Sequence, residues 1–220
     1  MNALWQYFRD DQSEILGWLR TTLWLAAAPV VVGLLISLPI GWAASRFRWS
    51  YPPLVTIAGL LYTIPSIVLF LVLPGILGTG ILDPVNVAVA LTIYCVALLV
   101  RVVADGLSSV SDATLAAASA MGYTNRQRLF AVQLPLAVPV IGAGLRVAAV
   151  SNVSLVAVAS TLGVAQLGSL FTTGYNATKH GSTPILLGLV LFIVVALAFD
   201  GAILLGLRVL TPWRRAVAAR

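Results

Sequence analysis

The sequence offers few side chains that could do covalent or metal chemistry. Cys95 is the only cysteine and His180 the only histidine, so one chain can supply neither a disulfide nor the ligand set of a zinc site. No segment has the glycine, lysine and serine or threonine spacing of a phosphate-binding loop. We therefore predict that the chain binds no metal or cofactor of its own and is not an enzyme.

Two charged residues lie deep within apolar segments. Arg146 follows Pro135 by eleven residues, and Asp200 precedes Thr211 by eleven. If these are helices that start and end at the same membrane face, both side chains lie about 16 Å from it, at about 1.5 Å rise per residue. An isolated charge at that depth is unfavourable. We predict that Arg146 and Asp200 pair, within one chain or across a dimer; the alternatives are that Arg146 snorkels alone or that Asp200 faces a watery cavity.

The elements that must position these charges follow from composition. The chain has 220 residues, a mean hydropathy of +1.01 and only 9% charged residues, which excludes an ordinary soluble domain. Crossing the hydrocarbon takes about 20 apolar residues as a helix. Uncharged stretches of sufficient length predict an all-α membrane protein with about five transmembrane helices, at residues 22–45, 54–73, 85–106, 136–158 and 185–209.

The distribution of lysine and arginine predicts the orientation of these spans. One face receives nine and the other only three, namely Arg9, Arg20 and Lys179. The richer face is expected to be cytoplasmic, so we predict the N-terminus outside and the C-terminus inside. The net charge of +6 is explained by this topology better than by a nucleic-acid partner. The nine are Arg46, Arg48, Arg101, Arg126, Arg128, Arg208, Arg214, Arg215 and Arg220.

Three segments lie outside the predicted spans. Residues 1–21 are expected to form a helix anchored by aromatic side chains at the outer interface, although a frayed lead-in is an alternative; Asp10, Asp11 and Glu14 argue against a removable signal peptide. Residues 159–184 are interrupted by glycines and predict a partly buried or re-entrant outer segment rather than a sixth span. Residues 213–220 are a predicted cytoplasmic tail. The apolar residues of the outer segment are Leu162, Val164, Leu167, Leu170 and Phe171.

The loop at 107–134 has the most specific pattern, with the sequence DATLAAASAMGYTNRQRLFAVQLP over residues 112–135. Ser111 or Asp112 is a good N-cap for a first short helix, and Gly122 is placed to end it in the left-handed conformation. Thr124, followed by Gln127, has the spacing of a capping box, which predicts a second short helix. A new hydrophobic segment is then expected to begin at Pro135.

This loop resembles the cytoplasmic coupling loop, or EAA loop, of permease subunits of ABC importers. Ala116 stands where that family has a glutamate. Residues 37–46, 62–70, 134–150 and 160–174 resemble segments of osmoprotectant permeases, although Val164 and Gln166 replace smaller residues. The resemblance extends from about residue 20 to residue 212 and implies a type I permease domain at 22–212. The matching loop positions are Ala116, Ala117, Ala118, Gly122, Leu134 and Pro135.

The resemblance implies a prokaryotic inner or plasma membrane protein that works within an assembly. Its expected partners are two cytoplasmic ATPases that use ATP and Mg, a second permease chain, an extracytoplasmic binding protein and membrane lipid. Because Ala116 lacks a carboxylate, both a homodimer and a heterodimer of permeases are open. The candidate ATPase contacts are Leu115, Met121, Tyr123 and Phe130, of which Leu115 and Phe130 have packing against the chain's own spans as an equal alternative.

The implied cargo is an osmoprotectant such as glycine betaine, carnitine or choline. Methionine or another amino acid, and betaine-like solutes such as ergothioneine, are the alternatives within the same architecture. A passive channel would need no capped two-helix loop, and an intramembrane enzyme would need more than one cysteine and one histidine. Aromatic cages bind quaternary ammonium groups, but the spacing of the candidate aromatics favours packing or anchoring, and no substrate-binding residue is predicted. These aromatics are Trp42, Tyr62, Phe70 and Tyr94.

Overall fold

The computed structural model describes residues 2–47, 49–177 and 182–213, and every regular element within them is a helix. The predicted all-α class is therefore confirmed. In chain order the elements are α1 (Asn2–Asp10), α2 (Gln12–Arg46), α3 (Tyr51–Thr63), α4 (Ser66–Leu77), α5 (Pro84–Ser108), α6 (Asp112–Ala120), α7 (Asn125–Arg128), the π-helical turn η1 (Leu129–Gln133), α8 (Leu134–Val158), the 3-10 turn η2 (Ala159–Leu162), α9 (Ser169–Asn176) and α10 (Ser182–Leu210).

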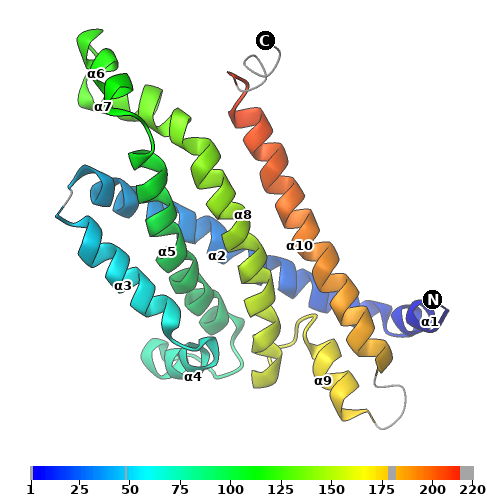
Figure 1. Cartoon of the computed structure of the whole chain (residues 1–220). Coiled ribbons are helices and arrows are strands. Elements are labelled where there is room, and N and C mark those ends of the chain that lie inside the picture. The colour runs from blue at the N-terminus through cyan, green and yellow to red at the C-terminus, as the bar shows by residue number, and fades with distance from the viewer. Residues whose placement is uncertain (1, 48, 178–181, 214–220) are drawn as a thin grey trace.

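Four helical segments among the described residues are long and apolar enough to cross a membrane. They are α2, α5, the continuous run Asn125–Leu162 that contains α8, and α10, and a fifth span results if the bent pair α3 and α4 counts as one. Figure 1 shows α2 crossing obliquely behind α5 and α8, with α3 beside α5 and α10 beside α8. The orientation relative to the two sides of a membrane stays a prediction.

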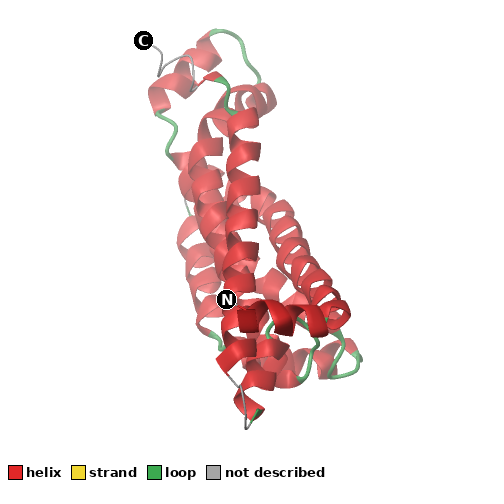
Figure 2. Ribbon diagram, turned by 90° about the vertical axis from the view of Figure 1, so that its right-hand side faces the viewer, coloured by secondary structure: helices red, strands yellow, loops and turns green. Residues whose placement is uncertain are grey.

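The two ends of the molecule carry different elements. The helices α6 and α7 lie at the same end as the C-terminal end of α10, whereas α4 and α9 lie at the other end (Figures 1 and 2). The predicted tail is described only at Trp213. Several residues used above fall outside the described part of the chain, namely Arg48, Lys179, His180, Arg214, Arg215 and Arg220.

Helices α2 and α5 approach each other closely because glycine lines the contact. A Cβ added to Gly33 would lie 2.6 Å from Cβ of Cys95, and one added to Gly41 would lie 2.7 Å from Cβ of Val103. Lipid supplies no hydrophobic force between helices, so small residues that bring backbones into contact stabilise the pair by packing. Cys95 is therefore a buried packing residue at this interface.

A buried asparagine fastens α8 to α2. Nδ2 of Asn152 donates to the carbonyl oxygens of Leu25, at 3.2 Å, and Ala26, at 2.8 Å. The Leu25 carbonyl lacks its usual helical donor because the residue four positions later is Pro29, which has no N–H. Asn152 thus satisfies an acceptor that the proline leaves free, and α2 stays one helix.

The helix predicted over residues 54–73 is broken in the structure, although the bent pair α3 and α4 still qualifies as one candidate span. Helices α3 and α4 meet at an angle of 97°, because the residue before a proline is pushed out of the helical region and Pro65 offers no N–H. Ile64 accordingly has extended backbone angles, φ −66° and ψ 127°. The hydroxyl of Tyr94 in α5 donates to the Ile64 carbonyl oxygen, so a contact from another helix satisfies the backbone at the break.

The other end of α3 is also fastened to α5. The Tyr51 hydroxyl donates to Oδ1 of Asp105 at 2.6 Å, and Nε of Arg101 lies 3.5 Å from Oδ2 of the same carboxylate. Both ends of α3 therefore take their positions from α5, and the direction of α4 depends on where α5 holds the break.

The predicted helix over residues 1–21 is shorter in the structure. α1 ends at Asp10, and α2 starts at Gln12, so residues 12–21 extend the first long helix instead. The reason is burial: Ile15 is 1% exposed, and the Thr22 side chain accepts a 2.9 Å hydrogen bond from the Leu167 N–H. These contacts hold the start of α2 against the segment that follows α8.

That segment, predicted as partly buried and irregular over 159–184, has this character in its described part. It consists of η2, a turn and the short helix α9. Val164, Leu167 and Leu170 are buried, and Leu162 and Phe171 pack at the edge of the same core. Gln166 is fully buried, with Nε2 donating to the Ala157 carbonyl oxygen at 3.3 Å. Val164 and Gln166, which replace smaller residues of the resembling permeases, are thus both buried within this segment.

Candidate coupling surface and membrane ion pair

The loop between α5 and α8 is built from local hydrogen bonds. Ser111, rather than Asp112, caps α6, and its hydroxyl accepts from the Thr114 N–H at 3.3 Å. Gly122 has φ +86°, which confirms the left-handed turn. The N–H of Gly122 donates to Ser119 and that of Tyr123 donates to Ala118, the bond pair of a Schellman motif. The chain therefore reverses sharply at Gly122.

The predicted capping box at Thr124 is confirmed. The Thr124 N–H donates to Oε1 of Gln127 at 2.9 Å, and the Gln127 N–H donates to the threonine hydroxyl at 3.4 Å. In addition, a guanidinium nitrogen of Arg128 donates to the Ser119 hydroxyl at 2.9 Å, which ties α7 to α6 across the turn. The two short helices thus form one unit.

The segment expected to begin at Pro135 is found as α8, which starts at Leu134 with the proline in its first turn, but no loop precedes it. α7 continues through η1 into α8, and the whole run from Asn125 to Leu162 is one helical rod. The Leu134 N–H bonds to the Leu129 carbonyl oxygen, five residues back, so the π-helical turn takes up the disturbance next to the proline. Nε2 of Gln133 donates to the Leu107 carbonyl oxygen at 3.1 Å, which holds this joint against α5.

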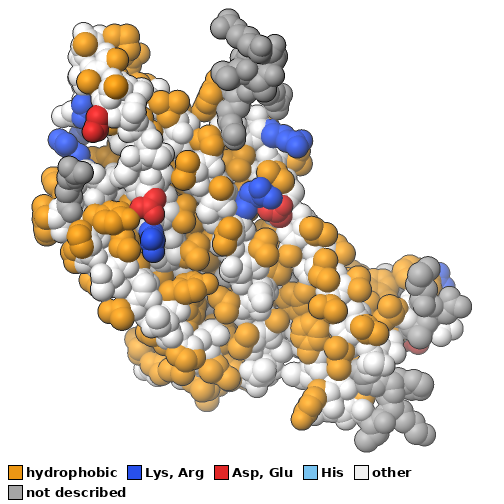
Figure 3. All heavy atoms as spheres, viewed as in Figure 1, with side chains coloured by type: hydrophobic (Ala, Val, Ile, Leu, Met, Phe, Trp, Pro, Cys, Tyr) orange, Lys and Arg blue, Asp and Glu red, His pale blue; other side chains and the backbone are white. Residues whose placement is uncertain are grey.

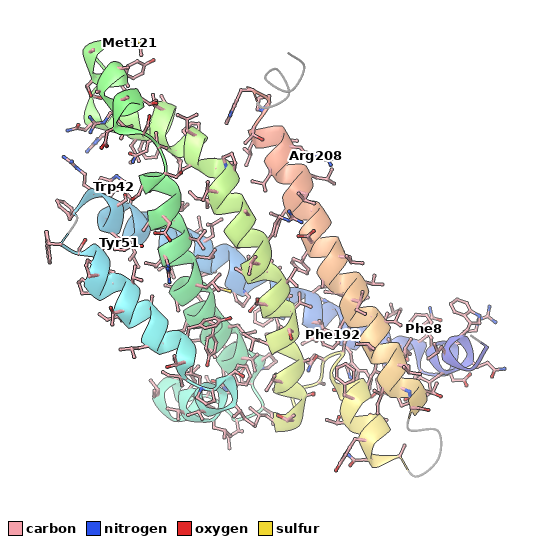
Figure 4. The ribbon with its side chains drawn as sticks, viewed as in Figure 1. Phe8, Trp42, Tyr51, Met121, Phe192 and Arg208 are labelled. Atoms are coloured by element: carbon pink, nitrogen blue, oxygen red, sulfur yellow. The ribbon has the colours of Figure 1, made fainter. Side chains whose placement is uncertain are left out.

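The positions that match the family motif differ in exposure. Ala116 and Ala117 are exposed, Ala118 is 1% exposed, and Leu134 and Pro135 are half-buried. Among the predicted docking residues, Met121 is 70% exposed, Phe130 66% and Tyr123 40%, whereas Leu115 is half-buried. Figure 4 shows Met121 at the tip of the unit. Phe130 keeps most of its surface exposed but also lines a hollow with Leu38 of α2, so both of its predicted roles stay predictions.

Two hollows flank this unit, and Trp42 of α2 lines both. The first is apolar and is shared by Trp42, Leu129 and Phe130, and the second contains Leu115 and Ala116. Sequence reasoning missed Trp42 as part of this surface. Its position four residues before Arg46, near the end of the first span, was the available signal. The polar residues of the second hollow are Ser45, Arg46, Asp112, Arg128 and Gln133.

Arg146 and Asp200 form a bidentate ion pair between α8 and α10. Nε of Arg146 lies 2.6 Å from Oδ1 of Asp200, and a terminal guanidinium nitrogen lies 2.8 Å from Oδ2. Two parallel charge-assisted bonds of this kind fix geometry as well as charge. The pair forms within one chain, so Arg146 does not snorkel alone. Figure 3 shows few charged side chains among many hydrophobic ones on the face of the molecule in view.

The structure brings together two of the four aromatic residues for which the sequence predicted packing or anchoring. The rings of Tyr62 and Tyr94 meet edge to face, with centroids 5.7 Å apart. Phe70 is 1% exposed and belongs to the core, as expected of a packing residue. Among the described residues, no three His, Cys, Asp or Glu side chains gather in a way that could hold a metal ion.

A comparison with protein families identifies the family to which the chain belongs. The model of the family described as "Binding-protein-dependent transport system inner membrane component" matches residues 33–208. The chain belongs to this family. It is therefore a multi-pass inner membrane component of a transport system.

Curated relatives match over most of the permease. The osmoprotectant import permease protein OsmW of Salmonella typhimurium is 33% identical over 175 residues, covering 78% of this chain and 81% of the relative. The choline transport permease OpuBD of Bacillus subtilis is 30% identical over 203 residues, covering 91% and 88%. The carnitine transport permease OpuCD of Listeria monocytogenes is 29% identical over 206 residues, covering 94% and 90%.

Solved structures share the fold at lower identity. An inward-facing MetNI methionine ABC transporter gives a TM-score of 0.80 at 22% identity, covering 91% of this chain and 97% of that one. An amino acid ABC transporter gives 0.75 at 21% identity, covering 92% and 97%. The permease therefore has the fold of ABC importer membrane subunits, and identity at this level carries no information on cargo.

Proposed function

We propose that the chain is the membrane-spanning subunit of an ATP-driven importer for an osmoprotectant of the quaternary ammonium class, such as glycine betaine, carnitine or choline. The observation that carries the cargo class is the set of relatives named for these compounds, at 29–33% identity over most of the chain. The methionine and amino acid transporters resemble the chain in fold at 21–22% identity, which favours neither of those cargoes.

The proposed assembly contains a second permease chain, two cytoplasmic ATPases and an extracytoplasmic binding protein. ATP and Mg would be bound and used by the ATPases, while this chain takes no part in the hydrolysis. Exposed apolar side chains at Met121 and Phe130 support docking of an ATPase at the unit formed by α6 and α7, because apolar and aromatic anchors dominate protein interfaces.

The proposed docking site is directly connected to a membrane-spanning helix. α7 is continuous with α8, and Arg128 ties α6 to the same unit. A displacement of α6 and α7 by closing ATPases would therefore move α8 as a lever rather than be absorbed in a loose linker. The ion pair between Arg146 and Asp200 would carry that motion to α10, beside the pathway.

The missing family glutamate has a candidate substitute. Ala116 shares its hollow with Asp112, Arg46 and Arg128. A carboxylate that meets a basic group of the ATPase could thus come from Asp112, in which case a homodimer of this chain suffices. Purification of tagged chain with its native partners tests the subunit composition: two different permeases in the complex would contradict the homodimer.

The decisive experiment is uptake by the reconstituted assembly. Vesicles that contain the permease and its ATPase, with binding protein outside and ATP inside, are expected to take up labelled glycine betaine, carnitine or choline. Methionine and ergothioneine are measured in parallel. ATP-dependent uptake of methionine without uptake of any quaternary ammonium compound would contradict the proposed cargo. Uptake that needs no ATP would contradict an importer of this type.

A further inference from the structure

A small cavity lies where α5, α8 and the break between α3 and α4 meet. Its volume is about 10 Å³, room for about one water molecule. Tyr62, beside the break, is 43% exposed and is one of the residues that line the cavity. The lining residues are Tyr62, Tyr94, Cys95, Leu98, Ala148, Ser151, Asn152 and Leu155.

Asn152, which lines this cavity, has an unused hydrogen-bond acceptor. The side chain is 1% exposed, and its Nδ2 is engaged by α2, yet its Oδ1 has no hydrogen-bond partner among the described residues. A buried unpaired carbonyl oxygen is costly and rare in native proteins. The oxygen carries a partial negative charge and is therefore available to attract a positively polarised group that enters the cavity.

The rings of Tyr62 and Tyr94 supply a second attraction for positive charge. Aromatic faces carry a negative quadrupole that attracts cations. The Tyr94 hydroxyl is fixed to the Ile64 carbonyl oxygen, so the Tyr94 ring cannot turn away freely. None of the lining residues is Lys, Arg, Asp or Glu. The wall therefore attracts a diffuse cation and offers no carboxylate with which a primary ammonium or a metal ion would pair strongly.

The cavity lies in the membrane interior. Tyr94 is ten residues into the 25-residue helix α5, so it lies about 15 Å from one helix end at about 1.5 Å per residue. The backbone break at Ile64 lies beside it, and irregular backbone at this depth is tolerated only where protein or a cavity satisfies it. At this depth, a cargo would meet the cavity while it crosses the membrane, not where it is delivered at the membrane surface.

We propose that Tyr62, Tyr94 and Asn152 form a transient site for the quaternary ammonium group of the cargo inside the permease. This inference rests on the proposed cargo class and specifies where in the chain that class is recognised. The space in the present conformation is too small for a trimethylammonium group. The cation enters when α3 and α4 move at their break, which displaces Tyr62 from the cavity mouth.

The test uses the reconstituted assembly with labelled choline and labelled glycine betaine as probes. Tyr62→Leu removes the aromatic face and is expected to lower uptake by about two- to thirtyfold, the range of a cation–π contact. Tyr62→Phe keeps the aromatic face and is expected to lose clearly less uptake than Tyr62→Leu. Trp24→Leu, at a 46% exposed aromatic of α2 that does not line the cavity, is the matched control and is expected to leave uptake unchanged.

A graded series separates the cation–π contact from simple packing. Phenylalanine carrying one, two or three ring fluorines at position 62 keeps a similar shape while weakening the quadrupole, so uptake is expected to fall stepwise. Equal uptake across the series, or Tyr62→Leu uptake within about twofold of wild type, would overturn the site while leaving the cargo intact. Absence of choline and betaine uptake by the wild-type assembly would instead contradict the proposed function.

Discussion

The break at Ile64–Pro65 and the joint at residues 121–135 each contain a proline at which the chain could change direction, with opposite results. At the break, α3 and α4 diverge by 97°. At the joint, the helix passes Pro135 without interruption and forms the rod Asn125–Leu162. Within the described residues, four further prolines lie inside helices beyond the first turn, namely Pro29, Pro39, Pro74 and Pro139. Proline alone therefore does not decide where a membrane helix breaks.

The two regions differ in the origin of the partners that satisfy their backbone. The acceptor at the break is bonded by Tyr94, thirty residues away in sequence, and Phe70 of α4 is buried in the core beyond the bend. The joint relies mainly on neighbours in sequence: the turn at Gly122, the capping box at Thr124 and the π-helical turn at Leu129. Gln133 adds one hydrogen bond to α5. A bend held from outside the segment and a joint held mainly from within it should respond differently to mutation.

The largest effect is expected from Gly122→Val at the joint. The residue has φ +86°, and an added Cβ would meet no atom within 4 Å, so the substitution introduces backbone strain of about 1–3 kcal/mol without a clash. We expect ATP-dependent uptake to fall about tenfold or more while the yield of folded chain is unchanged. Gly201→Val, in open space within α10, is the control. Normal transport by a well-expressed Gly122→Val chain would refute the coupling role.

A several-fold effect is expected from the ion pair that fastens α8 to α10. Arg146→Ala or Asp200→Ala leaves one charge unpaired within the membrane, which is unfavourable, and each is expected to lower uptake and the yield of folded protein. The double variant should lose less than the two single losses combined, because it leaves no unpaired charge. The measurement is uptake per folded chain in all four proteins. Strict additivity of the two losses, on a logarithmic scale, would show that the pair is not coupled.

A moderate effect is expected from Tyr94→Phe at the break. The change removes the only donor to the Ile64 carbonyl oxygen among the described residues, and an unpaired buried acceptor costs about 1–3 kcal/mol. The midpoint of thermal unfolding in detergent should fall by a few degrees. Tyr62→Phe is the matched control, since no hydrogen bond of the Tyr62 hydroxyl is found within the described residues. Equal midpoints for the two variants would mean that packing alone holds the bend.

The smallest effect is expected from Thr124→Ala in the capping box. Loss of the N-cap costs about 1 kcal/mol, and the long rod that follows confines the fraying to the first turn of α7. Hydrogen exchange at residues 125–128 should become faster while uptake changes by less than about twofold. Ser111→Ala, which removes the equivalent cap of α6, should instead affect residues 112–115. Faster exchange along all of α8 would show that the joint is less local than the structure indicates.

The sequence by itself determined the features whose partners lie within a few residues. The apolar stretches located the long helices, the glycine at position 122 marked the left-handed turn, and Thr124 with Gln127 marked the capping box. These follow from helix geometry and from the short reach of caps. The pairing of Arg146 with Asp200 was also predictable despite its distance in sequence, because the membrane imposes a common scale of depth on residues counted from helix ends.

Only the tertiary structure decided the features whose partners come from elsewhere in the chain. At the break before Pro65, Tyr94 of α5 satisfies the Ile64 carbonyl oxygen. At Pro29, where the helix continues, Asn152 of α8 satisfies the Leu25 carbonyl oxygen that the proline leaves without a donor. The meeting of Tyr62 with Tyr94, and the unpaired oxygen of Asn152 beside them, follow from how α3, α5 and α8 pack. Local sequence states which backbone groups lose their helical partners, but the packing of distant helices decides which of those groups find new ones.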